Sequence, residues 1–242
     1  MNSPALVPID KAAPHFDLVS LTMQACSVAK NAASSALDGL INGSPASLSA
    51  VRECEEKLDE FDRELDERLP QVITQVSPAE ARELLVCLKL MLDLERVGDL
   101  IASFAERSAI VRNRLEMEDV EHLTRMSCLL ENMLSHIAPA FRDRDVEQAI
   151  RILRSDPQID RLRNLLVGRH TESSDGFRVQ ESLHVLAMAN ALERAGDHVK
   201  NMAEELCHLA TGHTVRHLLR SKDKPVEQLY IEWLGRQSAD PK

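Results

Sequence analysis

A six-residue sequence occurs twice in this 242-residue chain, and this repetition constrains the fold more than any other feature. Leu94-Glu95-Arg96-Val97-Gly98-Asp99 returns 98 positions later as Leu192-Glu193-Arg194-Ala195-Gly196-Asp197, with only the fourth residue changed. Residues 21–23 likewise match residues 123–126, and residues 55–59 match residues 156–160. Near-constant offsets of 98 to 103 residues in three separate segments indicate two structural repeats of domain-scale size, and with them a duplicated site.

Start and stop signals divide the chain into six helices. Ser77-Pro78-Ala79-Glu80 predicts a helix start, because serine can cap, proline suits the first helical position and glutamate closes a capping box. Ser44-Pro45 predicts the start of the preceding helix in the same way, after an Asn42-Gly43 break. Eight glycines and ten prolines are too few for a turn-rich all-β protein. We expect helices over about 15–41, 45–75, 78–112, 116–141, 144–170 and 174–211, with Gly212 ending the last.

These helices predict an all-α fold of two tandem three-helix bundles related by the internal repeat. The first bundle takes residues 15–112 and the second residues 116–211. The two bundles pack either side by side or end to end. A polar C-terminal tail follows over residues 212–242, in which residues 226–234 suit a short helix.

Charge and composition exclude several classes of protein. A formal net charge of −10 disfavours binding to nucleic acid, which depends on Lys and Arg contacts to phosphates. Residues 1–14 lack the pattern of a secretory signal, and no apolar run approaches the ~18 residues of a membrane span, so we expect a cytoplasmic protein. The five cysteines are odd in number and scattered, as expected for reduced, mostly buried thiols.

The candidate site lies in four pairs of carboxylates, each spaced four residues apart. Glu95 with Asp99 and Glu193 with Asp197 stand in the repeated hexads, and on a helix each pair projects from one face. The second helix of each repeat carries a further pair, namely Glu55 with Asp59 and Asp156 with Asp160. Carboxylates that converge from two helices supply the hard oxygen ligands that Mg²⁺, Ca²⁺ or Mn²⁺ prefers, and such sites also take iron.

A structural interpretation stands beside the metal site. Acidic residues four apart are common on solvated helix faces, and Arg96 and Arg194 are placed to pair with the carboxylates of their hexads. Ser155-Asp156-Pro157 also resembles a helix start, which would commit the Asp156 carboxylate to capping. The hexad glycines indicate close helix approach, because glycine costs ~1 kcal/mol against alanine inside a helix.

These features together resemble the PhoU family over about residues 15–217. Members carry two three-helix repeats, each with E/D-x-x-x-D on two helices and L-E-R-x-G-D on the third. All eight carboxylates named above fit those positions. The family's proline followed by D-L-R appears here as Pro78 with Glu80-Ala81-Arg82, so that alanine replaces leucine, and Ser103 stands where many members have asparagine.

The resemblance implies a cytoplasmic adaptor and negative regulator in phosphate transport and homeostasis. It implies contact with the ATPase subunit of the phosphate ABC transporter and with the sensor histidine kinase of the phosphate regulon, which are its only links to the membrane. It also implies a homodimer, and metal binding on the carboxylate faces as iron or zinc clusters, or as Mg²⁺ or Mn²⁺.

Two alternatives come from other classes. A ferritin-like di-metal oxidoreductase would use Glu-x-x-His motifs, and the chain has Glu181 with His184 and Glu205 with His208. Both fall on the sixth expected helix, ~36 Å apart, so they cannot share one metal pair within a chain. A metal-free helical interaction module is the second alternative. The sequence has no G-x-S-x-G, H-E-x-x-H or Gly-rich phosphate loop, so we expect a protein that is not an enzyme.

Overall fold

The computed structural model describes residues 14–171 and 179–211, and nearly all of them are helical. The helices are α1 (Pro14–Asn42), α2 (Pro45–Val72), α3 (Pro78–Val111), α4 (Met117–Asp143), α5 (Val146–Thr171) and α6 (Val179–Thr211), with a short 3₁₀ turn at Arg112–Arg114. The six-helix prediction is confirmed, to within three residues at every end that the structure describes. The expected start of the sixth helix at 174, the Gly212 stop and the short helix at 226–234 lie outside the described residues.

The helix starts follow the sequence signals with one exception. The Ser77 hydroxyl accepts a hydrogen bond from the Glu80 amide at 3.3 Å, and the Glu80 carboxylate accepts one from the Ser77 amide at 2.8 Å, which completes the capping box. Pro45 opens α2 as expected, but the Ser44 side chain makes no capping hydrogen bond, so the prediction that it caps in the same way is wrong. The break before α2 depends on Gly43, whose φ of +67° favours glycine.

The alternative helix start at Ser155-Asp156-Pro157 is also wrong, because α5 continues through Pro157. The Ser155 hydroxyl donates to the Arg151 carbonyl at 3.1 Å, the bond expected inside a helix rather than at its first turn. The Asp156 carboxylate is therefore not used for capping and is available to the neighbouring helix.

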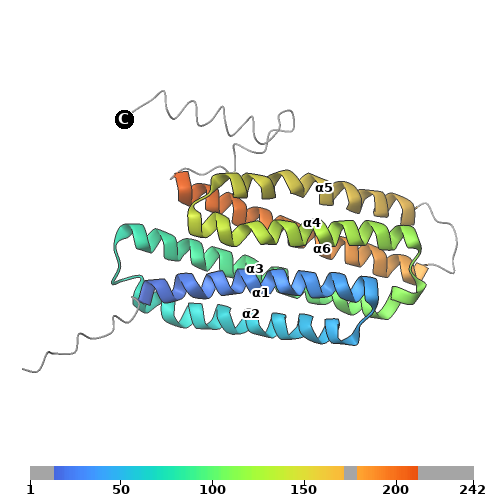
Figure 1. Cartoon of the computed structure of the whole chain (residues 1–242), viewed down its shortest axis with the longest axis horizontal. Helices are drawn as coiled ribbons and strands as arrows, with labels where there is room; N and C mark the ends of the chain where they lie inside the picture. The colour runs from blue at the N-terminus through green and yellow to red at the C-terminus, as the bar shows by residue number, and fades with distance from the viewer. Residues whose placement is uncertain (1–13, 172–178, 212–242) are drawn as a thin grey trace, which may run out of the picture.

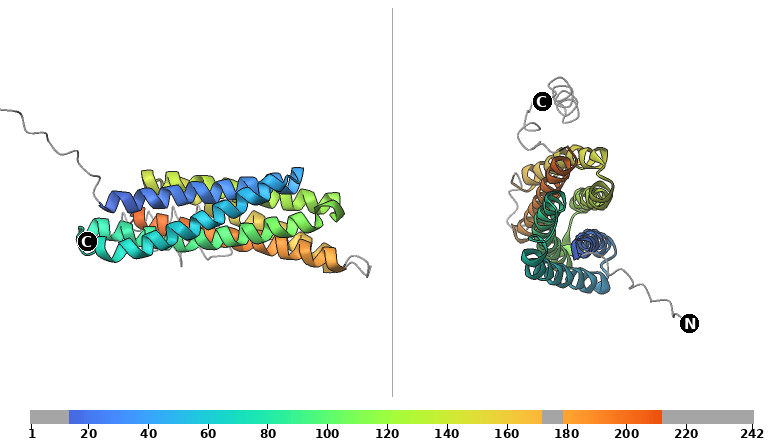
Figure 2. Two further views of the ribbon diagram at one scale, coloured as in Figure 1. Left: turned by 90° about the horizontal axis from the view of Figure 1, so that it is seen from below. Right: turned by 90° about the vertical axis from the view of Figure 1, so that its left-hand side faces the viewer.

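The two repeats lie side by side. Within each repeat the three helices contact one another, and the repeats meet where α3 packs on α6 and α1 packs on α4. Figure 1 shows the long helices running roughly parallel or antiparallel to one axis, and the end-on view in Figure 2 shows α3 and α6 in the middle, with α2 and α5 at the two ends of that row. The pairs α2–α3 and α5–α6 are thus equivalent and well separated.

Buried side chains of both repeats form one hydrophobic cluster that includes Phe104 and Phe141. All five cysteines are free, and three of them are buried. Burial raises the pKa of Cys26, Cys87 and Cys207 to about 12, which keeps these thiols protonated and unreactive. No helix within the described ranges is long and apolar enough to cross a membrane.

Candidate functional site

The hexad glycines bring the carboxylate-bearing helices together. A β-carbon at position 98 would lie 2.7 Å from Leu58 Cδ1 on α2, and one at position 196 would lie 3.1 Å from Ile159 Cδ1 on α5. Close approach of α2 to α3, and of α5 to α6, is therefore built around equivalent contacts in the two repeats, as the sequence predicts. We call the carboxylates beside these contacts the first seam (Glu55, Asp59, Glu95, Asp99) and the second seam (Asp156, Asp160, Glu193, Asp197).

The first seam carries negative charge that its surroundings do not neutralise fully. Burial and the nearby charges of Asp59 and Asp99 raise the pKa of Glu55 above its ordinary value. Burial and the charge of Asp99 raise the pKa of Glu95 in the same direction, against the opposing effect of Arg96. Carboxylates that share a site in this way favour either a proton or a bound cation.

A groove of about 290 Å³ opens between α2 and α3 at this seam. Its lining is mostly acidic, with the small side chains of Ala102 and Ser103 and one cation, Arg52, which pairs with Glu106 at 3.0 Å; the acidic residues are Glu55, Glu56, Asp99 and Glu106. The groove therefore places carboxylate oxygens from two helices around space that is open to solvent.

The expected pairing of Arg96 with its own hexad is present. Arg96 Nε lies 3.2 Å from Glu95 Oε2, and Arg96 Nη1 lies 3.7 Å from Asp99 Oδ2. The Arg96 side chain is 62% exposed, and ion pairs of such exposed residues contribute little to stability. This guanidinium is thus a weak, displaceable counter-ion.

The second seam has carboxylates at the equivalent positions, but different residues surround them. Burial and the charge of Asp156 raise the pKa of Asp160, and burial and the charge of Asp197 raise the pKa of Glu193. Asp156 is only 4% exposed and forms an ion pair with Lys200 of α6. A lysine ammonium is therefore built into the contact between α5 and α6.

No three His, Cys, Asp or Glu side chains within residues 14–171 and 179–211 are arranged so that they could hold a metal ion. The structure brings the predicted residues together in two pairs of helices but does not show a formed ligand group. Metal binding by the eight carboxylates stays a prediction.

Sequence analysis missed three residues beside the seams. Asp62 follows Asp59 by one turn of α2, and its Oδ1 atom is buried with no hydrogen-bond partner. Arg163 occupies the equivalent position on α5, where its Nε donates to the Asn190 side chain at 3.0 Å. The third residue is Lys200 of α6, which pairs with Asp156. Extending the alignment of the repeats beyond the hexads would have exposed all three, because it pairs Asp62 with Arg163 and Ala102 with Lys200.

Both Glu-x-x-His motifs lie on α6, so they do not face each other as a ferritin-like site requires. Glu181 accepts from Arg114 at 3.0 Å, and Glu205 accepts from Lys89 at 2.8 Å. Both glutamates are thus used in ion pairs with neighbouring elements.

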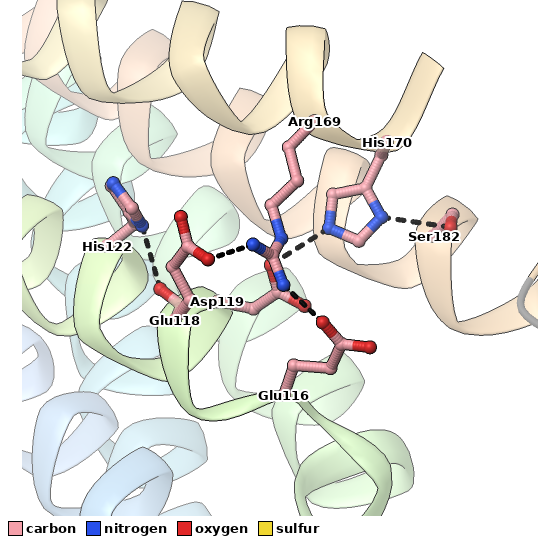
Figure 3. A network of polar contacts seen from close by, with 7 residues as sticks. All are labelled: Glu116, Glu118, Asp119, His122, Arg169, His170 and Ser182. Atoms are coloured by element: carbon pink, nitrogen blue, oxygen red, sulfur yellow. Dashed lines mark hydrogen bonds and ion pairs between the residues drawn. The ribbon is translucent and has the colours of Figure 1, made fainter. Parts of the chain in front are cut away.

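A polar network joins the start of α4 to the end of α5 and to α6 (Figure 3). Asp119 is buried and accepts from Arg169 Nε and His170 Nε2, each at 3.0 Å. Arg169 also pairs with Glu116 and Glu118, and His170 Nδ1 lies 2.9 Å from the Ser182 hydroxyl. These contacts fasten one end of the second repeat and involve none of the second-seam carboxylates.

Comparisons with known proteins match most of the helical body. A family model described as PhoU domain matches residues 22–108 and 123–206, one match in each repeat. A phosphate-specific transport system accessory protein PhoU homolog 1 from Thermotoga maritima is 29% identical over 184 residues, which is 73% of this chain and 78% of that protein. The corresponding homologue from Zymomonas mobilis is 26% identical over 196 residues, covering 79% of this chain and 83% of that protein.

Solved structures show the same fold. The crystal structure of PhoU from Pseudomonas aeruginosa aligns with a TM-score of 0.76 at 23% identity, covering 83% of this chain and 99% of that one. The phosphate transport system regulatory protein PhoU from Streptococcus pneumoniae aligns with a TM-score of 0.73 at 22% identity, covering 83% and 97%. The all-α architecture of paired three-helix repeats is thus shared with these proteins.

Proposed function

Because the chain belongs to the PhoU family, we propose that it is an accessory protein of a phosphate-specific transport system. One observation carries this proposal: the family model matches both repeats, and each match contains a complete Leu-Glu-Arg-x-Gly-Asp hexad. The curated relatives bear that function in their names, and the chain spans about four-fifths of their length. A non-enzymatic, cytoplasmic role fits this assignment.

The specific role that we propose is that of a metal-dependent adaptor and negative regulator. It would contact the ATPase subunit of the phosphate ABC transporter and a sensor histidine kinase, and it would hold the starvation response off when phosphate is abundant. A homodimer is part of the same proposal. The six-helix body offers large surfaces for such contacts, with exposed apolar side chains that include Leu85, Leu92 and Leu183.

The first seam fits a cation by its chemistry. Its donors are carboxylate oxygens, which suit Mg²⁺ and Mn²⁺ and also occur in iron sites. Glu55, Asp59, Glu95 and Asp99 would hold the ion beside the α2–α3 groove, and Arg96 is exposed enough to leave. When bound, the ion would neutralise the seam and hold α2 and α3 together, which would fix the surface that a partner contacts. The second seam has carboxylates at the equivalent positions, and the Lys200 ammonium lies against one of these carboxylates.

Genetic replacement in the native host tests the regulatory role. Deleting the gene should leave phosphate-starvation genes expressed at high phosphate, and the native chain should restore repression. The quadruple alanine variant of Glu95, Asp99, Glu193 and Asp197 should fold, as judged by circular dichroism, yet fail to restore repression. Repression that does not change on deletion would contradict the regulatory role, and full restoration by the folded quadruple variant would contradict only the role of the seams.

A binding measurement tests the partners directly. The purified chain should bind the transporter ATPase and the cytoplasmic part of the kinase, and light scattering should show its dimer. Equal binding by the native chain and the quadruple variant would show that partner binding does not depend on metal at these carboxylates.

A further inference from the structure

Two of the differences between the seams make the second seam more positive than the first. Ala102 of α3 corresponds to Lys200 of α6, and Asp62 of α2 corresponds to Arg163 of α5. Counting these positions with the four carboxylates gives a formal charge of −5 for the first repeat and −2 for the second. The scaffold is duplicated, but the charge of the site is not.

Lys200 stands among the second-seam carboxylates. It follows Gly196 by one turn of α6 and forms an ion pair with Asp156 across the contact with α5. The Lys200 side chain is 36% exposed, whereas that of Asp156 is 6% exposed, so the lysine reaches in from the edge of the contact to the buried carboxylate. The ion pair therefore places a cation of the protein itself in the acidic seam.

Arg163 adds a second positive charge to this seam. It lies one turn after Asp160 on α5, and its positive charge acts on both Asp160 and Glu193. Its hydrogen bonds to Asn190 and Asn164, each at 3.0 Å, hold the guanidinium in place. The equivalent residue of the first repeat, Asp62, adds a negative charge instead.

The first repeat has open space at the position equivalent to Lys200. Ala102 lines the α2–α3 groove beside Glu55 and Asp99, and its methyl group reaches far less than a lysine side chain would. The one cation that lines this groove, Arg52, is 56% exposed and pairs with Glu106, so a cation from solution could approach Glu55 and Asp99 without displacing a buried partner.

We propose that Lys200 takes the place of a metal ion in the second seam, so that metal binds the first seam alone. A divalent ion at the second seam would have to compete with the ammonium for Asp156, because this residue is 4% exposed and already has a cationic partner held on the neighbouring helix. This inference rests on the proposed metal binding for the first seam. It revises the prediction that all eight carboxylates are ligands, because it assigns Asp156, Asp160, Glu193 and Asp197 to an internal ion-pair cluster.

Exchanging the two residues tests the proposal in the full chain. Lys200→Ala gives the second seam the residue of the first, and Ala102→Lys gives the first seam the residue of the second. Metal content is measured by elemental analysis after dialysis against Mn²⁺ and then against metal-free buffer. Metal-dependent shifts of the melting temperature provide a second measurement.

Lys200→Ala should gain Mn²⁺ at the second seam with at least about tenfold higher affinity than the native chain shows there. Adding Glu193→Gln and Asp197→Asn to it should remove the gain. Ala102→Lys should lose the metal of the first seam. In the native chain, Glu95→Gln with Asp99→Asn should remove the metal, and Glu193→Gln with Asp197→Asn should leave it bound. Lys200→Gln, which keeps a long polar side chain, replaces Lys200→Ala if the alanine variant does not fold.

Two results would overturn the inference: no additional metal in the Lys200 variant, or native metal that is lost when the second-seam carboxylates alone are changed. A native chain without metal, combined with a Lys200→Ala variant that binds it, would support the replacement of metal by Lys200 in the second seam and contradict the proposed metal binding at the first seam. A native chain and a Lys200 variant that both lack metal would contradict both.

Discussion

Leu58 packs directly against the backbone of Gly98, and this contact determines how closely α2 can approach α3. A β-carbon at position 98 would lie 2.7 Å from Leu58 Cδ1, shorter than any ordinary carbon–carbon contact. Leu58 is 1% exposed, so it has no solvent-filled space into which to rotate. Because Glu55 and Asp59 flank Leu58 while Glu95 and Asp99 flank Gly98, the same contact assembles the first seam.

Gly98→Ala should therefore separate α2 from α3. Overpacking costs ~1–3 kcal/mol, which exceeds the ~1 kcal/mol that alanine gains over glycine inside a helix, so we expect the free energy of unfolding to fall by ~1 kcal/mol. Gly196→Ala is the matched control, because its nearest neighbour would lie at 3.1 Å and could adjust by a few tenths of an ångström. Urea denaturation of both variants measures the difference. Equal stability of the two variants would show that the glycine does not limit this approach.

The hexad repeat predicted the scaffold well because helical periodicity and capping are local properties. The six helices and the Ser77 capping box follow from residues near one another in the chain, and the repeated glycines marked where helices approach closely. The packing of α3 on α6 cannot be predicted in this way, because it depends on the shapes of whole helix faces. For this reason the sequence could not distinguish a side-by-side from an end-to-end arrangement of the repeats.

The charge environment of the seams was predicted less well. The sequence placed eight carboxylates on equivalent faces, but Lys200 and Arg163 lie in regions that resemble ordinary charged helix surface. Their role depends on which helix lies opposite: only the contact between α5 and α6 shows that the Lys200 ammonium meets Asp156. The Asp119 network was missed for the same reason, because its members are 51 residues apart in the chain.

The raised pKa values of Glu55 and Glu95 predict how the stability of the metal-free protein depends on pH. Both carboxyls hold protons in the folded chain at pH values where the unfolded chain, with pKa near 4.5, has lost them. The free energy of unfolding should therefore decrease as the pH rises from about 4.5 through the raised pKa values.

Removing one of these charges should restore part of the free energy of unfolding that is lost as the pH rises. With a chelator present at pH 7, Glu95→Gln should be more stable than the native chain by ~0.5 kcal/mol, the size of a repulsion between like charges four residues apart. At pH 3 both side chains are neutral, so the difference should vanish. Glu60→Gln is the control, because the hydrogen bond from Lys57 lowers the pKa of Glu60, so its replacement should not stabilise. A Glu95→Gln variant that is less stable at pH 7 would contradict the repulsion.

Asp119→Asn should destabilise the second repeat. The carboxylate is 2% exposed and serves both Arg169 and His170. Breaking a buried ion pair from one side costs ~3–5 kcal/mol, but Arg169 keeps Glu116 and Glu118, so we expect a loss of ~2 kcal/mol in the free energy of unfolding.

Asp143→Asn serves as the control for this loss, because Asp143 pairs with Arg142 on the exposed surface and its replacement should leave stability nearly unchanged. Hydrogen exchange should show the Asp119→Asn effect first at the start of α4 and the end of α5. Similar stability of the two variants would mean that the network in Figure 3 contributes no more than a surface pair.

Gly43→Ala should weaken the connection between α1 and α2 by two independent effects. Alanine at a φ of +67° is strained by ~1–2 kcal/mol. Its β-carbon would also lie 2.1 Å from Arg112 Nη1, and Arg112 donates hydrogen bonds to the carbonyls of Leu40 and Ile41 at 3.1 and 2.8 Å. Displacing this guanidinium leaves the last carbonyls of α1 without their donor, so the total loss should be ~2 kcal/mol or more.

Gly39→Ala separates this effect from the general difference between glycine and alanine. Gly39 lies within α1, where its β-carbon would meet Ser47 Cβ at an ordinary 3.5 Å. Alanine there should stabilise the helix by ~0.5–1 kcal/mol. The melting temperatures of the two variants should therefore shift in opposite directions. In an Arg112→Ala background, Gly43→Ala should cost less stability than in the native chain, because no guanidinium is left to be displaced. Stability changes that simply add would show that backbone strain, rather than the Arg112 contact, accounts for the requirement for glycine at position 43.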